Sequence, residues 1–225
     1  MIPYRLVRSR RKTLAIHITK DAAVEVRAPL KMSESYIDGF VKKKEKWIED
    51  HVARRRQVNE EKKAFSINYG DNVLLYGKPY PLRAWEKNSV GFDGECLWAP
   101  GSLTTGEIKG ALEQIYRAAA KRLMKNRVGE YAGLMGVKPA SVRITGAKTR
   151  WGSCSGKNNI SFSWRLMMAE MDVIDYVAVH ELAHLKELNH SPRFWAVVEE
   201  VMPDYPDRKR KLKQLQDRLS TQDWD

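Results

Sequence analysis

Three histidines and a glutamate, spread over eleven residues, constrain this chain more than any other feature. From His180 to His190 the sequence reads H-E-L-A-H-L-K-E-L-N-H. On a helix, His180 and His184 are four residues apart and project from one face. Two neutral imidazoles in this arrangement are the usual beginning of a zinc site, and Glu181 beside them is a candidate general base. The motif therefore predicts a helix that carries two metal ligands and a catalytic carboxylate.

His190 is the candidate third ligand, but it cannot reach the metal from a continuous helix. Six residues at about 100° each would turn it to the wrong side. We expect the helix to stop near Asn189, which tolerates a left-handed backbone, and a new helix to begin with Ser191 as N-cap and Pro192 at N1. Glu187 is the alternative third ligand. It occupies the position of the glycine in H-E-x-x-H-x-x-G-x-x-H, a pattern with the same histidine spacing.

The same segment is also a core helix. Apolar residues recur in it at helical spacing. They are Val173, Ile174, Val177, Ala178, Leu182 and Leu185. A single histidine there would be an ordinary core residue, but burying three histidines and a glutamate without a metal would be costly. We therefore favour a metal site, with Zn²⁺ as the expected ion; three imidazoles also suit nickel, cobalt or copper.

Bulk composition narrows the class of protein. The chain has 225 residues, of which 43% are hydrophobic, enough for a sizeable core. No apolar run is long enough to span a membrane, and the first residues lack a signal-peptide stretch. Two cysteines do not make a disulfide framework, so we expect a cytoplasmic protein with no membrane partner.

Positive charge is concentrated in the N-terminal part. Residues 1–65 carry 17 Lys/Arg against 9 Asp/Glu, a net +8 of the overall +12. Such a field attracts polyanions, and binding of a polyanion through the basic N-terminal region is one expectation. The alternative is a solvated helix face, and no recognised nucleic-acid module supports the first interpretation.

Local patterns predict a mixed α+β chain in two regions. Residues 1–100 are expected to be strand-rich with one long helix, from Glu34 to about Lys63 with Ser33 as its cap. The boundary is placed at Pro100-Gly101. Residues 101–225 are expected to begin with a capping box, Thr104 to Glu107, and a long helix that ends near Gly133 or Gly136. Two strands should follow, around Val142–Ile144 and Ile160–Trp164, paired across a turn at 155–159.

A second motif precedes the histidines, in the stretch Arg150-Trp151-Gly152-Ser153-Cys154-Ser155. Glycines among small hydroxyl residues describe a tight turn that a backbone or a ligand can approach. Trp151 is a candidate wall of a substrate site, and Arg150 and Tyr176 are candidate substrate-binding donors. Cys154 is a possible fourth metal ligand, although it would leave no position for a catalytic water. The competing interpretation is a hairpin corner that packs on the metal helix.

These motifs resemble the YgjP-like zinc metallopeptidase family, which is related to the SprT-like proteins. The resemblance rests on residues 151–155, 175–185 and 189–195 and extends more weakly over most of the chain. It implies a minimal metalloprotease core of the gluzincin type, with the H-E-x-x-H helix packed on a small sheet, His180, His184 and His190 on zinc, and Glu181 as base. It does not imply the cysteine-rich zinc ribbon that many SprT-like proteins add.

The leading functional expectation is a zinc hydrolase, most simply a metallopeptidase that cleaves protein or peptide substrates. Glu181 would activate a zinc-bound water for attack on the carbonyl. Asp175, five residues before His180, could orient an imidazole. One alternative is a metal-dependent nucleoside triphosphate pyrophosphatase, since the family includes a member assigned to UTP. Another is a non-catalytic zinc-binding protein, which the presence of Glu181 disfavours.

Overall fold

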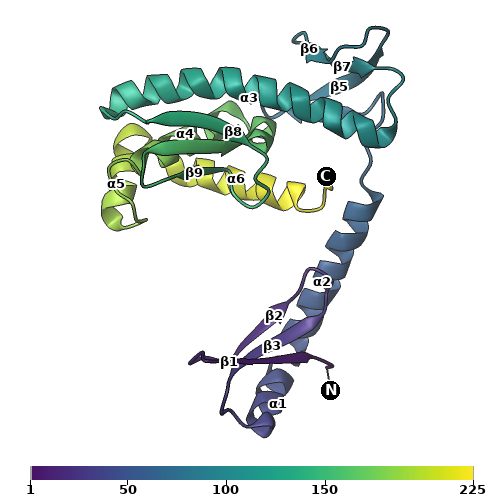
Figure 1. Cartoon of the computed structure of the whole chain (residues 1–225), viewed down its shortest axis with the longest axis vertical. Coiled ribbons are helices and arrows are strands. Elements are labelled where there is room, and N and C mark those ends of the chain that lie inside the picture. Colours follow the sequence, from purple (N-terminus) through teal and green to yellow (C-terminus); the bar gives the residue numbers. More distant parts are fainter. Residues whose placement is uncertain (1, 225) are drawn as a thin grey trace. The chain divides into compact units, whose positions relative to one another are not determined.

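The computed structural model describes residues 2–224, which form two compact units (Figure 1). The first contains residues 2–65 and 219–223, and the second contains residues 66–218 and 224. Each unit is described by itself. Together they hold six α-helices, one 3-10 helix and three small sheets in the described residues, so the α+β class expected from the sequence is confirmed.

The first unit packs two helices on a three-stranded sheet. Its elements are β1 (Arg5–Ser9), β2 (Ala15–Ile18), β3 (Val24–Pro29), α1 (Glu34–Lys43) and α2 (Glu45–Ala64). The central strand β3 pairs parallel with β1 and antiparallel with β2. Alternate residues of β3 point inward, as a half-buried strand requires, and meet the apolar stripe of the helices. This core consists of Val24, Val26, Ala28, Ile37, Val41 and Ile48.

The single long helix expected over residues 34–63 is two helices. Lys44 leaves the helical region, with φ −106° and ψ 11°, and α2 starts directly after it. Ser33 is the N-cap of α1, as predicted, although its side chain makes no capping hydrogen bond. Periodicity did not reveal the break, because the apolar stripe continues from Val41 to Ile48 without a glycine or proline between them.

The second unit begins with a four-stranded sheet in the order β4-β5-β7-β6. The strands are β4 (Asn72–Leu75), β5 (Lys78–Trp85), β6 (Gly91–Phe92) and β7 (Leu97–Pro100). The β4–β5 hairpin turns on Tyr76 and Gly77, both at positive φ, as a two-residue type I′ turn demands. A Cβ on Gly77 would lie 2.5 Å from Glu170 Cγ. The turn therefore packs against Glu170, the residue directly before the helix that carries the histidines.

The remaining elements of this unit build the framework of the site. They are α3 (Thr105–Met135), β8 (Ser141–Thr145), β9 (Gly152–Cys154), β10 (Asn159–Ser163), η1 (Trp164–Met168), α4 (Met171–Ala183), α5 (Pro192–Val201) and α6 (Tyr205–Leu219). The α3 helix starts as expected: the Glu107 carboxylate accepts hydrogen bonds from the Thr104 N–H and hydroxyl, at 2.8 and 2.7 Å. It ends at Gly136, which is left-handed with φ 63°.

The strand pairing before α4 differs from the prediction. The turn after Ser155 joins β9 to β10 in an antiparallel hairpin, while β8 pairs parallel with β10 from its other side. Trp164 belongs to η1 rather than to the strand. The sequence did not indicate β9, because Gly-Ser-Cys has neither alternation nor β-branched residues. As a result β9 is the edge strand of the sheet β8-β10-β9.

The α4 helix lies at the centre of this framework and packs against α3, β9 and α5 (Figure 1). Ten of its thirteen residues are buried, from Val173 to Ala183, which explains its almost uniformly apolar sequence. Among residues 2–224, none of the helices combines the length and apolarity needed to cross a membrane.

Residues 66–100 group with the second unit, so the compact units divide between Phe65 and Ser66. As a functional boundary between a strand-rich N-terminal region and a catalytic region, the division at residue 100 stays a prediction.

Candidate metal centre

The site is built at the C-terminal end of α4. His180 and Glu181 lie in its last turn, and His184 is its C-cap residue. The chain leaves the helix in a tightened turn, in which Leu185 and Lys186 donate to the carbonyls of Leu182 and Ala183, each at 3.0 Å. Such i→i+3 bonds satisfy carbonyls that the end of a helix would otherwise leave without donors.

The return of His190 follows from the start of α5. Ser191 caps that helix by accepting from the Phe194 N–H, and Pro192 occupies its first turn, as predicted. The expected left-handed stop at Asn189 is wrong, because the positive-φ residues other than glycine in the described chain are Ala22, Tyr76 and Asn158. The helix stops earlier, at Ala183, and six residues of turn lead back to His190.

The three imidazoles converge on one point. One ring nitrogen from each of His180, His184 and His190 lies within 4.8 Å of the others. His180 Nε2 and His190 Nε2 are 3.0 Å apart. A tetrahedral zinc with Zn–N bonds of about 2.1 Å separates its nitrogen ligands by about 3.4 Å, so the spacing suits a metal ion of this size.

The hydrogen bonds and protonation states of the imidazole rings also suit a metal ion. His184 Nδ1 lies 3.2 Å from the Glu187 carbonyl oxygen, a partner that fixes this nitrogen as a donor and leaves Nε2 as the free lone pair. Burial, then the neighbouring His184, His190 and Lys209, lower the pKa of His180 to about 3. Burial also lowers the pKa of His184. Both rings are therefore neutral at pH 7, the state in which they bind metals.

Glu181 is held against the edge strand. A Cβ on Gly152 would lie only 2.5 Å from Glu181 Oε1, so only glycine lets the β9 backbone approach this carboxylate. Glu181 is 5% exposed, and its Oε2 has no hydrogen-bond partner in residues 2–224. Burial raises the pKa of Glu181 to about 7, against the opposing charge of Arg150. A buried carboxyl with one free oxygen and a pKa near neutrality can both accept and return a proton.

The three predicted substrate-binding residues differ in their exposure to solvent. Arg150 is exposed, and its charge acts on Glu181. Trp151 is half-buried, and its carbonyl accepts from the Ser163 N–H. Tyr176 is only 3% exposed, one turn before His180, and packs edge-on against that ring with centroids 5.9 Å apart. Arg150 therefore borders Glu181, whereas Tyr176 supports His180 from within the core.

Three residues with roles expected from the sequence, Asp175, Cys154 and Glu187, have other surroundings in the structure. The Asp175 carboxylate pairs with Arg127 of α3, at 2.9 Å, and so is engaged away from the imidazoles. Within residues 2–224, the potential metal-binding group contains the three histidines and neither Cys154 nor Glu187. Cys154 is a free thiol on β9, and Glu187 contributes its carbonyl to His184.

Sequence reasoning missed the aromatic wall around the imidazoles. Phe194 packs against all three histidine rings, with centroid distances of 4.5–4.9 Å, and Trp195 stacks on His190 at 5.8 Å. Trp195 in turn stacks on Tyr205 of α6 at 5.2 Å. The place of Phe194 and Trp195 beside His190 depends on the return of the chain after α4, which the sequence pattern alone does not show.

Comparison with known proteins identifies one family and two similar solved structures. The family described as YgjP-like, metallopeptidase domain, matches residues 12–215. Among solved structures, the chain is similar to the metallopeptidase zymogen abylysin of Pyrococcus abyssi, with 28% identity over 44% of this chain and 92% of that one, and a TM-score of 0.35. It is also similar to the metallopeptidase zymogen jannalysin of Methanocaldococcus jannaschii, with 19% identity over 40% and 94%, and a TM-score of 0.37. Among curated proteins, none matches the chain.

Proposed function

This chain belongs to the YgjP-like metallopeptidase family, and from that premise we propose that it is a zinc-dependent peptidase. In this proposal His180, His184 and His190 hold the ion, and Glu181 is the general base and acid. The observation that carries it is the convergence of three imidazole nitrogens within 4.8 Å of one another, with the buried Glu181 next to His180 in the last turn of α4.

The chemistry divides between the ion and the chain. When bound, zinc supplies a Lewis acid that polarises a substrate carbonyl and makes water a better nucleophile. Glu181 takes the proton of the attacking water at Oε2, the oxygen that has no other partner in the described residues. Because its pKa is about 7, the same carboxyl can then return the proton to the leaving amine nitrogen. The Gly152 backbone against Oε1 keeps the carboxyl in place between the two transfers.

The surrounding residues orient rather than react. Phe194 and Trp195 fix the imidazole planes, and the Glu187 carbonyl fixes the tautomer of His184. Arg150 is the best-placed substrate-binding donor of the predicted set, because it is exposed and acts on Glu181. Trp151 stays a candidate wall of the substrate site. The burial of Tyr176 favours a packing role for that residue.

The test is metal content and hydrolysis of an unfolded protein, measured on wild type, His190→Ala and Glu181→Gln. We expect about one zinc per wild-type chain, lost in His190→Ala and kept in Glu181→Gln. Hydrolysis should be lost in both variants, with a fall of at least a hundredfold in kcat for Glu181→Gln, the usual scale for a general base. Glu187→Gln is the matched control, and it should keep both metal and activity.

Three results would contradict the proposal. Full peptidase activity in a chelated, metal-free protein would exclude the histidine site from the reaction. Hydrolysis of nucleoside triphosphates alone, lost in Glu181→Gln, would favour the pyrophosphatase, whereas a bound zinc with no hydrolysis of either substrate would favour a non-catalytic role.

A further inference from the structure

One basic residue of α6 differs from its neighbours. Arg208, Arg210, Lys211 and Lys213 each have a carboxylate partner at 2.7–2.9 Å. Lys209, in the middle of this run, has none in the part of the chain that the structure describes. Its ammonium instead lies 4.5 Å from the centre of the Trp195 ring. A cation over an aromatic face is held in place there but keeps hydrogen-bonding capacity for another group.

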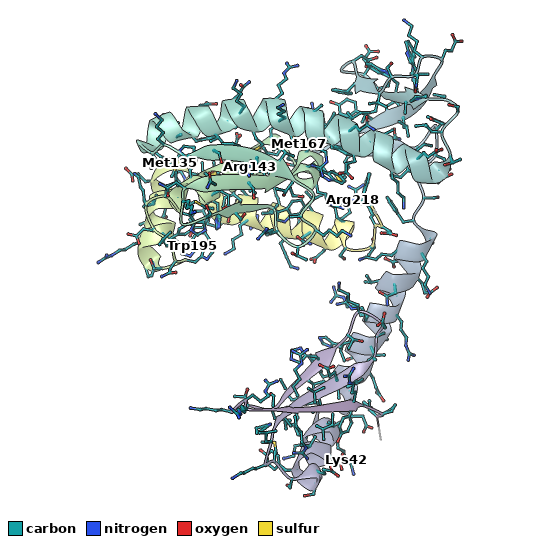
Figure 2. The ribbon with its side chains drawn as sticks, in the orientation of Figure 1. Lys42, Met135, Arg143, Met167, Trp195 and Arg218 are labelled. Atoms are coloured by element: carbon teal, nitrogen blue, oxygen red, sulfur yellow. The ribbon has the colours of Figure 1, made fainter. Side chains whose placement is uncertain are left out.

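The Trp195 ring connects Lys209 to the metal centre. Trp195 stacks on His190, with ring centroids 5.8 Å apart, and its centroid is also 5.8 Å from that of His180. Lys209 is exposed on the surface of α6. The ammonium therefore lies at the rim of the site, on the side of α5 and α6, where Figure 2 labels Trp195.

Arg150 is a second cation at the rim. It is exposed and makes no hydrogen bond or ion pair within residues 2–224. It comes two residues before Gly152, whose backbone touches the Glu181 carboxylate. Arg150 precedes β9, whose Gly152 contacts Glu181, whereas Lys209 belongs to α6 and contacts Trp195 beside His190. The two cations therefore come from different elements that border the centre.

We propose that Arg150 and Lys209 form two anion subsites that select peptides with acidic side chains near the scissile bond. The inference rests on the proposed peptidase function and names its substrate class. Both cations lack an acidic partner in the described chain. Lys209 is held against Trp195 beside His190, and Arg150 lies two residues from the Gly152 contact with Glu181. Carboxylates spaced along an extended peptide can reach two separated cations at once, whereas a triphosphate concentrates its charge in one place. An arginine on a carboxylate also permits paired hydrogen bonds.

The test measures binding and turnover separately. Binding is followed by fluorescence anisotropy in zinc-loaded protein that carries Glu181→Gln, so that the peptide stays intact. The probes are two labelled peptides of one length and sequence, differing only in glutamate or glutamine on both sides of the central bond. We expect the acidic peptide to bind more tightly. Arg150→Gln and Lys209→Gln should each reduce this preference two- to fivefold, the usual scale for exposed charge pairs, and the double variant should abolish it.

The controls remove the same charge elsewhere. Arg143 lies on β8, the far edge of the sheet from β9 (Figure 2), and Arg210 is paired with Asp207 on α6. Arg143→Gln and Arg210→Gln should retain the preference of the parent protein. In enzyme with Glu181 intact, Arg150→Gln and Lys209→Gln should raise KM for the acidic peptide more than for the neutral one, with zinc content unchanged.

An equal loss of preference in the controls would overturn the proposal, because the effect would then come from net charge. Equal binding of the two peptides by the parent protein would also overturn it. So would a nucleoside triphosphate that binds more tightly than the acidic peptide and depends on Arg150 and Lys209. If neutral peptides are cleaved with dependence on zinc and Glu181 but acidic ones are not preferred, only this inference fails. If no peptide is cleaved, the proposed function itself fails.

Discussion

At the residue scale, the contact between Gly152 and Glu181 is the tightest constraint on the site. We expect Gly152→Ala to displace the carboxyl, because the new methyl group would lie 2.5 Å from Oε1 and within 2.7 Å of Cγ and Cδ. The cost in the free energy of unfolding should be about 1–3 kcal/mol, as for other overpacked positions. Activity should fall much further than stability, with zinc content retained.

The matched control is Gly156→Ala in the same hairpin, where a Cβ has no atom within 4 Å. The prediction is tested by measuring the thermal unfolding, zinc content and kcat of both variants. Equal kcat values for the two variants would show that Gly152 is not what holds Glu181.

Glu181 should also leave a signature in the pH dependence of stability of the metal-free protein. Burial raises its pKa from 4.5 to about 7 on folding, so the folded state binds its proton more tightly than the unfolded state. The stability that this proton contributes is complete below pH 4.5 and is lost as the pH rises to 7 and above. At about 1.4 kcal/mol per pKa unit, the loss is about 3 kcal/mol.

Glu181→Gln cannot ionise and should not show this loss. Denaturant titrations of both proteins at pH 4 and pH 8, with a chelator present, measure the difference. The stability of the variant relative to wild type should rise by about 3 kcal/mol between the two pH values. A constant difference would mean that the carboxyl is not desolvated in the folded protein.

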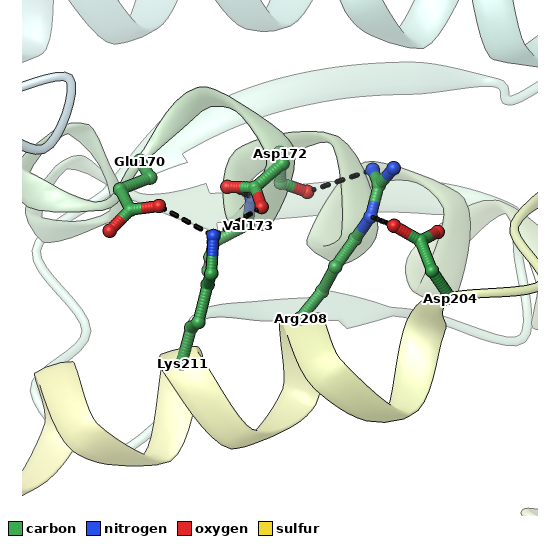
Figure 3. Close-up of polar contacts among 6 residues, drawn as sticks. All are labelled: Glu170, Asp172, Val173, Asp204, Arg208 and Lys211. Carbon is green, nitrogen blue, oxygen red and sulfur yellow. Dashed lines mark hydrogen bonds and ion pairs between the residues drawn. The ribbon is translucent and has the colours of Figure 1, made fainter.

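At the element scale, α6 is fastened to the start of α4 by a polar network (Figure 3). Lys211 Nζ donates to Glu170 and Asp172, at 2.7 and 2.8 Å. Arg208 donates to the Asp172 carbonyl at 3.1 Å and to Asp204 at 2.9 Å. This attachment matters for the site, because α4 carries His180 and Glu181 while α6 carries Tyr205 and Lys209.

We expect Lys211→Met to lower the free energy of unfolding at pH 7 only slightly, because the pair is partly exposed and screened by solvent. Burial alone would raise the pKa of Asp172, but the hydrogen bond and charge of Lys211 outweigh it, and the pKa lies below 3.8. The contribution of the pair is therefore present above pH 3.8 and is lost as the pH falls through the pKa of the folded protein.

Lys213→Met is the control on the same helix, since it breaks only an exposed pair with Asp217. Chemical denaturation at pH 7 and pH 3 compares the two variants. If Lys213→Met costs as much as Lys211→Met at pH 7, the network does not fasten α6 more firmly than an ordinary surface pair does.

The sequence predicted the local features of helices and strands but not the contacts between distant elements. The H-E-x-x-H spacing, the Ser191-Pro192 start and the Thr104 capping box depend on neighbouring residues, and local physics places them correctly. The pairing of β8 with β10 and the packing of β9 on Glu181 depend on residues far apart in the sequence. Gly152 therefore looked like a turn residue, and only its contact with Glu181 shows why a side chain is excluded.

The contacts of Asp175 and Lys209 also depend on residues far apart in the sequence. Asp175 was expected to orient an imidazole, but its carboxylate pairs with Arg127 of α3. Lys209 could not be distinguished from the other basic residues of its helix by sequence. Only the structure shows that its ammonium contacts the Trp195 ring and, within residues 2–224, has no carboxylate partner.

At the scale of the whole molecule, the two compact units have separate cores, and every residue of the candidate site lies in the second. Ile48 is fully buried in the first unit and Leu112 in the second. Truncating a buried leucine or isoleucine to alanine costs about 2–5 kcal/mol in the free energy of unfolding. We therefore expect Ile48→Ala to unfold the first unit at a lower temperature and leave the zinc site intact.

Scanning calorimetry measures the unfolding temperatures of the two units. Zinc content and peptide hydrolysis, measured at a temperature between the two, show whether the site is intact. Ile48→Ala should lower the unfolding temperature of the first unit, and bound zinc and hydrolysis of a short peptide should persist above that temperature. Chelation of the metal should lower only the unfolding temperature of the second unit. Leu112→Ala should lower the zinc-dependent transition, because α3 packs directly on α4. If Ile48→Ala loses its zinc at the temperature at which the first unit unfolds, the first unit is needed to maintain the second.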